Sequence, residues 1–185
     1  NGPLLVEDRN GVPNSAYSFD GKDDRIETPQ KNFPTGKVDR TTSIWFRLPD
    51  RGNKPLAVLW GAGLAAPQKL VAIQIGQSIG GPAVLSTDSY ANRVVIKSVP
   101  LNDSEWHNVI WVLADGTAKT YIDGKEVEAR PFTVDTSAYE FSNIGGSHKS
   151  DQTLLGEIDD VRIYSRALSD EQVKALYDLE KPKAE

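Results

Sequence analysis

The fold is decided by residues 106–129, which read WHNVIWVLADGTAKTYIDGKEVEA. Two Asp-Gly pairs, Asp115-Gly116 and Asp123-Gly124, begin eight residues apart in this stretch, between runs of apolar residues. Asp-Gly in that setting indicates a two-residue type I′ hairpin turn, because both central positions need a positive φ. The stretch therefore predicts a three-strand antiparallel meander, with the apolar run 109–113 as a strand that is buried on both faces.

Further strands are indicated on both sides of this meander by apolar residues that alternate with other residues. Two runs show the alternation: Ile44, Phe46 and Leu48, and Val71, Ile73 and Ile75. Ile158, Val161 and Ile163 follow the same period except for one slip, which is typical of a strand with a β-bulge. Many short strands with few helical segments favour two antiparallel sheets stacked as a jelly roll.

One segment near the end of the chain has a helical pattern. Ser169 can cap its N-terminus, with Gln172 three residues later as the partner in a capping box. Pro182 limits the helix at its other end. We therefore predict an all-β sandwich with a short C-terminal helix, a single domain over residues 1–179, and a polar tail or linker over residues 180–185.

The composition excludes several classes of function. The 185 residues fit one domain, and 21 basic against 26 acidic residues give a net charge of −5, which argues against binding to nucleic acid. The longest apolar stretch is 11 residues, Leu56 to Ala66, so we expect no membrane insertion. Cysteine is absent, which excludes disulfides and sites built on a thiolate. Methionine is absent even at position 1, so we expect a mature or excised part of a longer protein.

Several motifs, in order along the chain, resemble those of laminin-G-like, concanavalin A-like modules. They are the opening strand motif at 16–26, the middle hairpins at 106–111 and 121–124, and the closing strand and helix at 144–146, 156–164, 166–169 and 176–177. Leu155 departs from the pattern, because the family often has an aromatic residue there. The resemblance implies a two-sheet antiparallel jelly roll in an extracellular or secreted module, and a fold shared by lectins, glycan hydrolases and adhesion modules.

Acidic residues gather in two places that the resemblance brings together. They are Asp20, Asp23 and Asp24 on a turn, and Asp159 and Asp160 where the last strand slips. Carboxylates that converge repel one another unless a cation joins them, and Ca²⁺ takes six to eight oxygen ligands. The family often holds calcium in such a place, which implies ligands at Asp20, Asp23 and Asp160, and then Asp24 and Asp159. The alternative is that these residues bond to their own turns and pair with Arg25 and Arg162.

Catalysis is not expected from the residues that could carry it. Glu157 and Asp159 lie in a pattern similar to the strand motif of laminarinase-type glucanases, where two Glu residues bracket an Asp. Arg162 or Val161 stands where the second Glu should be, so the acid that protonates the leaving group is missing. We expect His107 to be a packed strand residue, and His148 to be exposed in a loop.

Aromatic side chains are the candidates for sugar binding, because a sugar stacks its apolar face on Trp or Tyr. Trp60 lies in a Gly- and Pro-punctuated stretch that is predicted as a loop, and Tyr90 and Tyr139 come next. The alternative for Trp60 is a core residue beneath that loop.

The leading hypothesis is therefore a noncatalytic extracellular module that binds carbohydrate or a cell-surface glycan and holds a structural Ca²⁺. A protein-interaction or adhesion module of the same fold is the first alternative. A glycan hydrolase or lyase is the second. Glycan binding would distinguish the leading hypothesis from the adhesion module, and turnover of a β-glucan would indicate the hydrolase.

Overall fold

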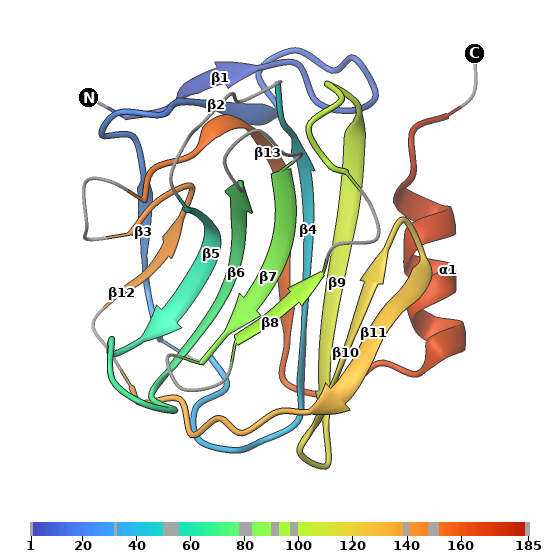
Figure 1. The fold of residues 1–185 in the computed structure, drawn as a ribbon. Helices are drawn as coiled ribbons and strands as arrows, with labels where there is room; N and C mark the ends of the chain where they lie inside the picture. The colour runs from blue at the N-terminus through green and yellow to red at the C-terminus, as the bar shows by residue number, and fades with distance from the viewer. Residues whose placement is uncertain are drawn as a thin grey trace.

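The computed structural model describes residues 2–31, 33–49, 56–77, 83–89, 93–96, 100–138, 141–147 and 152–183. Its chain forms two stacked antiparallel sheets, with β5 to β8 in front of the larger sheet and one helix at its side in Figure 1. This is the predicted sandwich with a short C-terminal helix.

The larger sheet has seven strands. In spatial order they are β1 (Leu4–Val6), β2 (Ala16–Asp20), β13 (Leu155–Tyr164), β4 (Arg40–Arg47), β9 (Trp106–Ala114), β10 (Thr117–Ile122) and β11 (Lys125–Pro131). The smaller sheet has six, in the order β3 (Ile26–Pro29), β12 (Phe141–Ile144), β5 (Ala57–Gly63), β6 (Leu70–Gln77), β7 (Ala83–Asp88) and β8 (Arg93–Ile96). Because β13 lies between β2 and β4, the two ends of the chain meet in the larger sheet.

The core lies between the inner faces of the two sheets. It contains all six residues of the alternating runs that predicted strands: Ile44, Phe46, Leu48, Val71, Ile73 and Ile75. Trp111 packs edge-on against Phe132 in this core, with ring centroids 5.4 Å apart. The period of two in the sequence thus predicted correctly which residues of these two strands face the core between the sheets.

Both Asp-Gly pairs form the predicted turns of the meander. The φ angles are 47° at Asp115 and 73° at Gly116, and 51° at Asp123 and 74° at Gly124. The strands that they join, β9, β10 and β11, are neighbours in the larger sheet, as predicted. The turn residues alone therefore specified this part of the topology.

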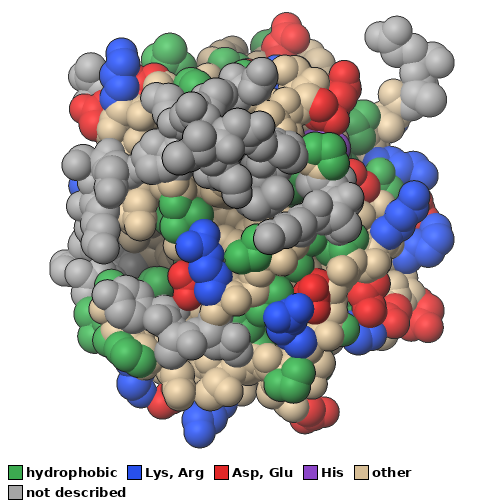
Figure 2. Space-filling model, in the orientation of Figure 1, with side chains coloured by type: hydrophobic (Ala, Val, Ile, Leu, Met, Phe, Trp, Pro, Cys, Tyr) green, Lys and Arg blue, Asp and Glu red, His purple; other side chains and the backbone are tan. Residues whose placement is uncertain are grey.

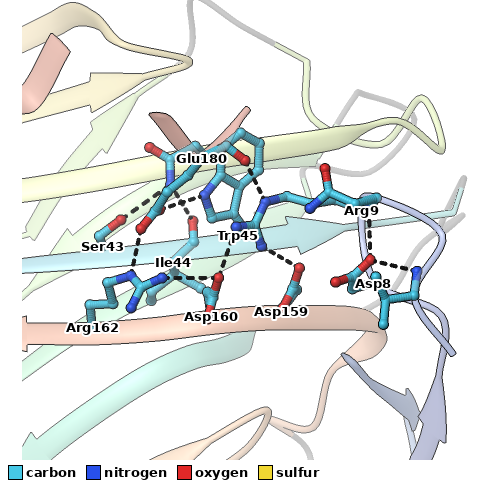
Figure 3. A network of polar contacts seen from close by, with 12 residues as sticks. Asp8, Arg9, Ser43, Ile44, Trp45, Asp159, Asp160, Arg162 and Glu180 are labelled. Atoms are coloured by element: carbon cyan, nitrogen blue, oxygen red, sulfur yellow. Dashed lines mark hydrogen bonds and ion pairs between the residues drawn. The ribbon is translucent and has the colours of Figure 1, made fainter. Parts of the chain in front are cut away.

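The slip in the last strand is a β-bulge, as predicted. Asp159 lies opposite Trp45 and Val161 opposite Ile44, so Asp160 is the extra residue, and its φ is 40°. The bulge keeps Ile158 in the core before the slip and packs Val161 against it after. It also directs two consecutive carboxylates toward the outer face of the larger sheet, as Figure 3 shows.

The helix α1 (Asp170–Glu180) covers part of that outer face. Ser169 and Gln172 form the predicted capping box at its N-terminus. Its apolar side packs on β9 and β10 through a small second core that includes Val173, Ile110 and Tyr121. The described part of the chain contains no helix that is long and apolar enough to cross a membrane.

The predicted tail boundary at residue 180 is wrong by one residue. Glu180 is the last residue of α1 and is buried, with its carboxylate bonded to Trp45 Nε1 at 3.1 Å and to Arg162 Nε at 2.6 Å. Tyr177, one turn earlier, stacks on Trp45 with ring centroids 5.7 Å apart. The last turn of the helix is therefore anchored to the sheet and does not belong to the tail.

Arg9, from the connection between β1 and β2, joins the same network (Figure 3). It bonds to the Glu180 carbonyl at 2.7 Å, to Asp160 at 2.8 Å and to Asp159, and its guanidinium lies 4.8 Å from the centre of the Trp45 ring. One side chain thus connects the N-terminal segment, the bulge of β13 and the end of α1.

Candidate functional site

A cleft of about 540 Å³ opens on the outer face of the smaller sheet. Its described lining comes from four strands and three connecting segments. The residues are Leu56, Val58, Gly61, Gly63, Leu64, Ala65, Ala66, Leu70, Ala72, Gln74, Asp88, Asn143, Gly146, Ser147 and Gln152. A volume of this size is in the range of pockets that bind small ligands.

The floor of the cleft is made of residues with small side chains. Gly61 of β5 lies opposite Ala72 of β6 on one side and Asn143 of β12 on the other, and Gly63 lies opposite Leu70. The residues of β5 and β6 that point inward belong to the core, so the residues that point outward line the cleft. The missing side chain of Gly61 allows a ligand to approach the backbone of the sheet, whereas at Gly63 the place of a Cβ is already taken by the carbonyl oxygen of Lys69.

Polar groups lie among these small and apolar residues. Gln74 of β6 is only 4% exposed, and its Oε1 atom has no hydrogen-bond partner within the described part of the chain. Ser147 and Gln152 are joined at the edge of the cleft, where the Ser147 hydroxyl lies 2.8 Å from Gln152 Oε1. The arrangement of apolar walls with a few amide and hydroxyl groups suits a polar ligand with an apolar face.

The charges near the cleft do not form a patch of one sign. Asp88 is the one charged residue in the described lining, and Arg93, opposite it in β8, bonds to Ser86 at 3.3 Å. In the view of Figure 2, Lys and Arg side chains alternate with Asp and Glu side chains over the described surface. In this view the described charges are therefore mixed in sign.

The prediction that Trp60 lies in a loop is wrong. Trp60 belongs to β5 and is 2% exposed, so it has no face on which a sugar can stack. A bulge in β5 breaks the register between Val58 and Trp60, and Leu59 and Trp60 both contribute to the core. The alternative reading, a core residue, is the correct one.

Three other aromatic or histidine predictions cannot be placed. Tyr90, Tyr139 and His148 all lie outside the residues that the structure describes. Their proposed roles stay predictions.

The predicted acidic cluster is divided into two groups. Carboxylate oxygens of Asp20, Asp23 and Asp24 lie within 4.8 Å of one another. Asp24 accepts a hydrogen bond from the Asp20 backbone N–H at 3.0 Å, and Asp20 accepts one from the Lys22 N–H at 2.8 Å. These three residues supply hard oxygen donors at a turn, which is the donor type that Ca²⁺ prefers.

Asp159 and Asp160 do not join that group, so the prediction that all five carboxylates converge is wrong. Asp20 lies opposite Leu155 in β13, and Asp159 comes four residues later, about 13 Å along the strand at 3.3 Å per residue. Asp159 pairs with Arg9 and Asp160 pairs with Arg9 and Arg162. Burial raises the pKa of Asp159, and Asp160 raises it further, against the opposing charge of Arg9.

Glu157 has an arginine as its partner and no second carboxylate in the described contacts. The Arg47 Nε donates to Glu157 Oε2 at 2.7 Å, and the Arg47 guanidinium lies 5.0 Å from the centre of the Trp106 ring. Retaining hydrolysis needs a second carboxyl group about 5–5.5 Å from the first. The geometry agrees with a structural role for this residue.

His107 is packed in β9, as expected, and is held between two carboxylates. Its Nδ1 lies 2.9 Å from Asp123 Oδ2 and its Nε2 lies 3.1 Å from Asp103 Oδ1. Burial disfavours the charged ring, but the hydrogen bonds and charges of both aspartates outweigh burial and raise the pKa of His107. In its charged form the ring therefore stabilises the hairpin turn at Asp123.

We expect this contribution to depend on pH. Since the folded-state pKa lies above the ordinary value of 6.5, the stabilisation is complete below pH 6.5 and is lost as the pH rises through the folded-state pKa. Urea unfolding at a series of pH values from about 5.5 to 9 should show this loss in the parent protein and not in His107→Gln. Equal pH dependence in both proteins would contradict the assignment.

The cleft residues were not identified from the sequence, although one signal was present. The alternation that placed Val71, Ile73 and Ile75 in the core also places Ala72 and Gln74 on the opposite face. An amide beside small residues on an outward strand face is a mark of a recessed surface. Gly61 and Gly63 obscured this signal in the neighbouring strand, because glycines in a sequence are usually taken to indicate a loop.

Comparison with known proteins agrees with the geometry. The family model of the concanavalin A-like lectin/glucanases superfamily matches residues 20–174, and no curated protein matches the chain. Domain 4 of an extracellular arabinanase from Geobacillus stearothermophilus, solved with arabinotriose, has 21% identity and a TM-score of 0.67 over 95% of this chain and 81% of its own.

Two other solved structures have the same fold. A heptameric SAP-like pentraxin from Limulus polyphemus has 16% identity and a TM-score of 0.69 over 89% of this chain and 82% of its own. The CBM40 domain of the Ruminococcus gnavus IT-sialidase has 11% identity and a TM-score of 0.64 over 88% and 96%. The strand order, the motifs and the family match together confirm the resemblance, and the chain belongs to the concanavalin A-like lectin/glucanases superfamily.

Proposed function

We propose that this protein is a noncatalytic, extracellular carbohydrate-binding module and that its glycan lies in the cleft of the smaller sheet. The observation that carries the proposal is the floor of Gly61 and Ala72 beside the buried amide of Gln74. A sugar ring presents an apolar face of C–H groups and a rim of hydroxyls. The small floor and apolar walls suit the face, and the amide groups suit the rim.

Relatives support a glycan as the ligand class. The arabinanase domain was solved with arabinotriose, and another similar structure is the CBM40 domain of a sialidase. Both domains share the fold with this chain and come from proteins that act on glycans. Sequence identities of 21% and 11% support a shared fold but do not indicate which sugar this chain binds. The ligand is therefore inferred from the cleft itself.

The proposal assigns no reaction to the cleft. Asp88 is the one carboxylate in its described lining, and glycoside hydrolysis needs two. Glu157, the carboxylate that resembled a glucanase residue, lies in the other sheet and pairs with Arg47. A glycan recovered intact after incubation with the protein is the expected result.

A protein-interaction or adhesion module is the second candidate. It is favoured by the edge strand β1, where Leu4 is 73% and Leu5 51% exposed. An edge strand offers unpaired backbone groups, so a partner could pair with it. Absence of glycan binding by the folded protein would favour this candidate.

The test of glycan binding is Gly61→Leu. A Cβ at Gly61 would meet Ala72 Cβ at 3.5 Å and Val58 Cγ1 at 3.6 Å, which are ordinary contacts, and a leucine side chain would then fill the cleft. We expect glycan affinity to fall about tenfold or more, which is about 1.4 kcal/mol, with the melting temperature almost unchanged. Array screening followed by calorimetry measures the affinity.

The matched control is Ala129→Leu. Ala129 is exposed on β11 of the other sheet, so this change adds a leucine side chain away from the cleft. Affinity should stay at the parent value. Retained binding in Gly61→Leu would reject the cleft as the site.

We also propose that Asp20, Asp23 and Asp24 hold a structural Ca²⁺. The proximity of their oxygens supports it, as does the burial of Asp24, because a buried carboxylate beside two others is stabilised by a cation. Asp159 and Asp160 are no longer part of this proposal, because Arg9 and Arg162 neutralise them. Backbone carbonyls and water would supply the remaining ligands.

Calcium should therefore stabilise the fold. The unfolded chain has no preformed site, so free calcium at 100 times the dissociation constant adds about 2.7 kcal/mol. For a chain of this size that corresponds to a rise of roughly 5–11 °C in melting temperature. Asp23→Asn should remove the rise, while Asp178→Asn, at an exposed carboxylate on α1, should keep it. Metal-free protein that melts at one temperature in EDTA and in calcium would reject the site.

A further inference from the structure

We propose that the cleft prefers glycans that carry methyl groups, as N-acetyl, O-acetyl and 6-deoxy sugars do, over sugars that present only hydroxyl groups. This inference rests on the proposed function, and it names the class of sugar that the site accepts. It is carried by aliphatic side chains that run through the middle of the cleft, between two polar flanks.

The strand register places polar residues at the two flanks of the cleft. Ala72 of β6 lies between Gly61 of β5 and Asp88 of β7. Gly61 lies opposite Asn143 of β12 on its other side. All four residues line the cleft. A row across the four strands is therefore polar at both ends and has two small residues in its middle.

Along β5 and β6, aliphatic side chains continue this middle in both directions. Toward one end the lining contains Val58 and Leu56, and the Leu56 Cδ1 atom lies 3.1 Å from the place of a Cβ on Gly76. Toward the other end it contains Leu70 and Leu64, and Leu64 is 44% exposed. These residues form an aliphatic stripe, which consists of Leu56, Val58, Ala72, Leu70 and Leu64.

The exposed end of the aliphatic stripe is held by hydrogen bonds of the connection between β5 and β6. The Leu64 N–H donates to Ser137 Oγ at 3.0 Å, and the Leu64 carbonyl accepts from the Ala66 N–H at 2.7 Å. The Gln68 N–H donates to the carbonyl of Ser89 at 2.8 Å. The backbone of Leu64 is therefore positioned before a ligand arrives, so a contact with this residue costs little ordering.

An aliphatic stripe cannot replace the water that surrounds a sugar hydroxyl. A hydroxyl that loses water without a new partner is penalised, whereas a buried methyl group improves the affinity by about a factor of four. Gln74 also lies on the outer face of β6, opposite Val58, but its Oε1 atom is buried. The middle of the cleft therefore suits a carbon substituent of the sugar, and the flanks suit its hydroxyl groups.

The experiment uses the intact protein and pairs of sugars that differ in a methyl-bearing group. Chitotriose is compared with cellotriose, acetylated xylotriose with xylotriose, and L-fucose with L-galactose. In every pair for which calorimetry detects binding, we expect the methyl-bearing sugar to bind about fourfold or more tightly than its partner. Neither member of the fucose pair has an amide, so this pair separates the methyl group from the amide of an N-acetyl group.

Two variants connect the preference to the aliphatic stripe. Leu56→Ser and Leu64→Ser remove its two ends, and at least one of them should lower the affinity for the methyl-bearing sugar about fourfold, to that of its partner sugar. The matched control is Leu179→Ser, because Leu179 is 82% exposed on α1 and lies outside the cleft lining. It should leave both affinities at the parent value. A preference that survives both changes in the stripe, in variants that melt like the parent, would overturn the role of the stripe.

The outcomes separate this inference from the function beneath it. Sugars that bind equally well with and without methyl groups, and are lost in Gly61→Leu, would keep the cleft as a glycan site and overturn the preference. No binding of any sugar, or binding that Gly61→Leu leaves intact, would overturn the proposed function and this inference with it. Tighter binding of methyl-bearing sugars that is lost in Gly61→Leu and weakened by a change in the stripe would support both.

Discussion

Arg9→Leu should destabilise the protein by about 3–5 kcal/mol, which lowers the melting temperature by roughly 6–20 °C. The side chains of Arg9 and Asp159 are 6% and 5% exposed. Removing the arginine would leave Asp159 charged and buried without its partner, and it would also break the bond to the Glu180 carbonyl. Thermal and urea unfolding would measure the loss.

Arg130→Leu is the matched control. Arg130 pairs with Glu128 at 2.8 Å but is 48% exposed, and exposed ion pairs contribute about 0–1 kcal/mol. A loss in Arg9→Leu no larger than that in Arg130→Leu would show that the network of Figure 3 contributes little.

Two further measurements connect the loss to Asp159. In the double variant Arg9→Leu with Asp159→Asn, part of the stability should return, because a neutral amide needs no counter-ion. The deficit of Arg9→Leu should also shrink as the pH falls. Burial already raises the pKa of Asp159, and below that pKa the carboxyl group is neutral.

Features of the fold that depend on neighbouring residues were predictable from the sequence. The Asp-Gly turns, the capping box of Ser169 and Gln172, and the bulge near Asp160 all involve residues that lie within a few positions of one another. Their patterns follow from allowed φ angles, hydrogen bonds to the first helical turn and the period of a strand. Each was confirmed.

Trp60 shows where the period of two misleads. The bulge of β5 makes Leu59 and Trp60 both inward, so the alternation disappears at the place where it was needed. Gly61 and Gly63 then resembled loop residues, although they are the outward positions of a strand that carries the cleft. A recessed strand face needs small side chains, and these are the residues that sequence patterns associate with turns.

The acidic residues show the limit set by distance along the chain. Asp159 and Arg9 are 150 residues apart, and no local pattern indicates that they meet. The sequence left two alternatives open: a cation held by all five carboxylates, or pairing of these residues with Arg25 and Arg162. The pairing of Asp160 with Arg162 is confirmed, whereas Arg25 pairs with Glu27 and Arg9 pairs with both Asp159 and Asp160. Asp20, Asp23 and Asp24 lie close enough to share an ion.

Gly63→Ala should be among the most harmful single changes to this protein. The φ angle of Gly63 is 96°, and a Cβ there would lie 2.1 Å from the carbonyl oxygen of Lys69. That oxygen belongs to the backbone next to β6, so the clash cannot be relieved by turning a side chain. We expect a loss of about 3 kcal/mol or more, and a melting temperature lower by at least about 6 °C.

Gly61→Ala, two residues away on the same strand, is the matched comparison and should have the opposite outcome. Its Cβ would make contacts of 3.5 Å or longer, and an alanine restricts the unfolded chain, so stability should stay within about 0.5 kcal/mol or rise by up to about 1 kcal/mol. Urea unfolding of both variants would measure the difference. Equal losses would mean that the smaller sheet tolerates no side chain at either position. A larger loss in Gly63→Ala would show that the backbone at Gly63 requires a glycine. Gly61 would then be a floor residue that can be changed to alter the cleft without altering the fold.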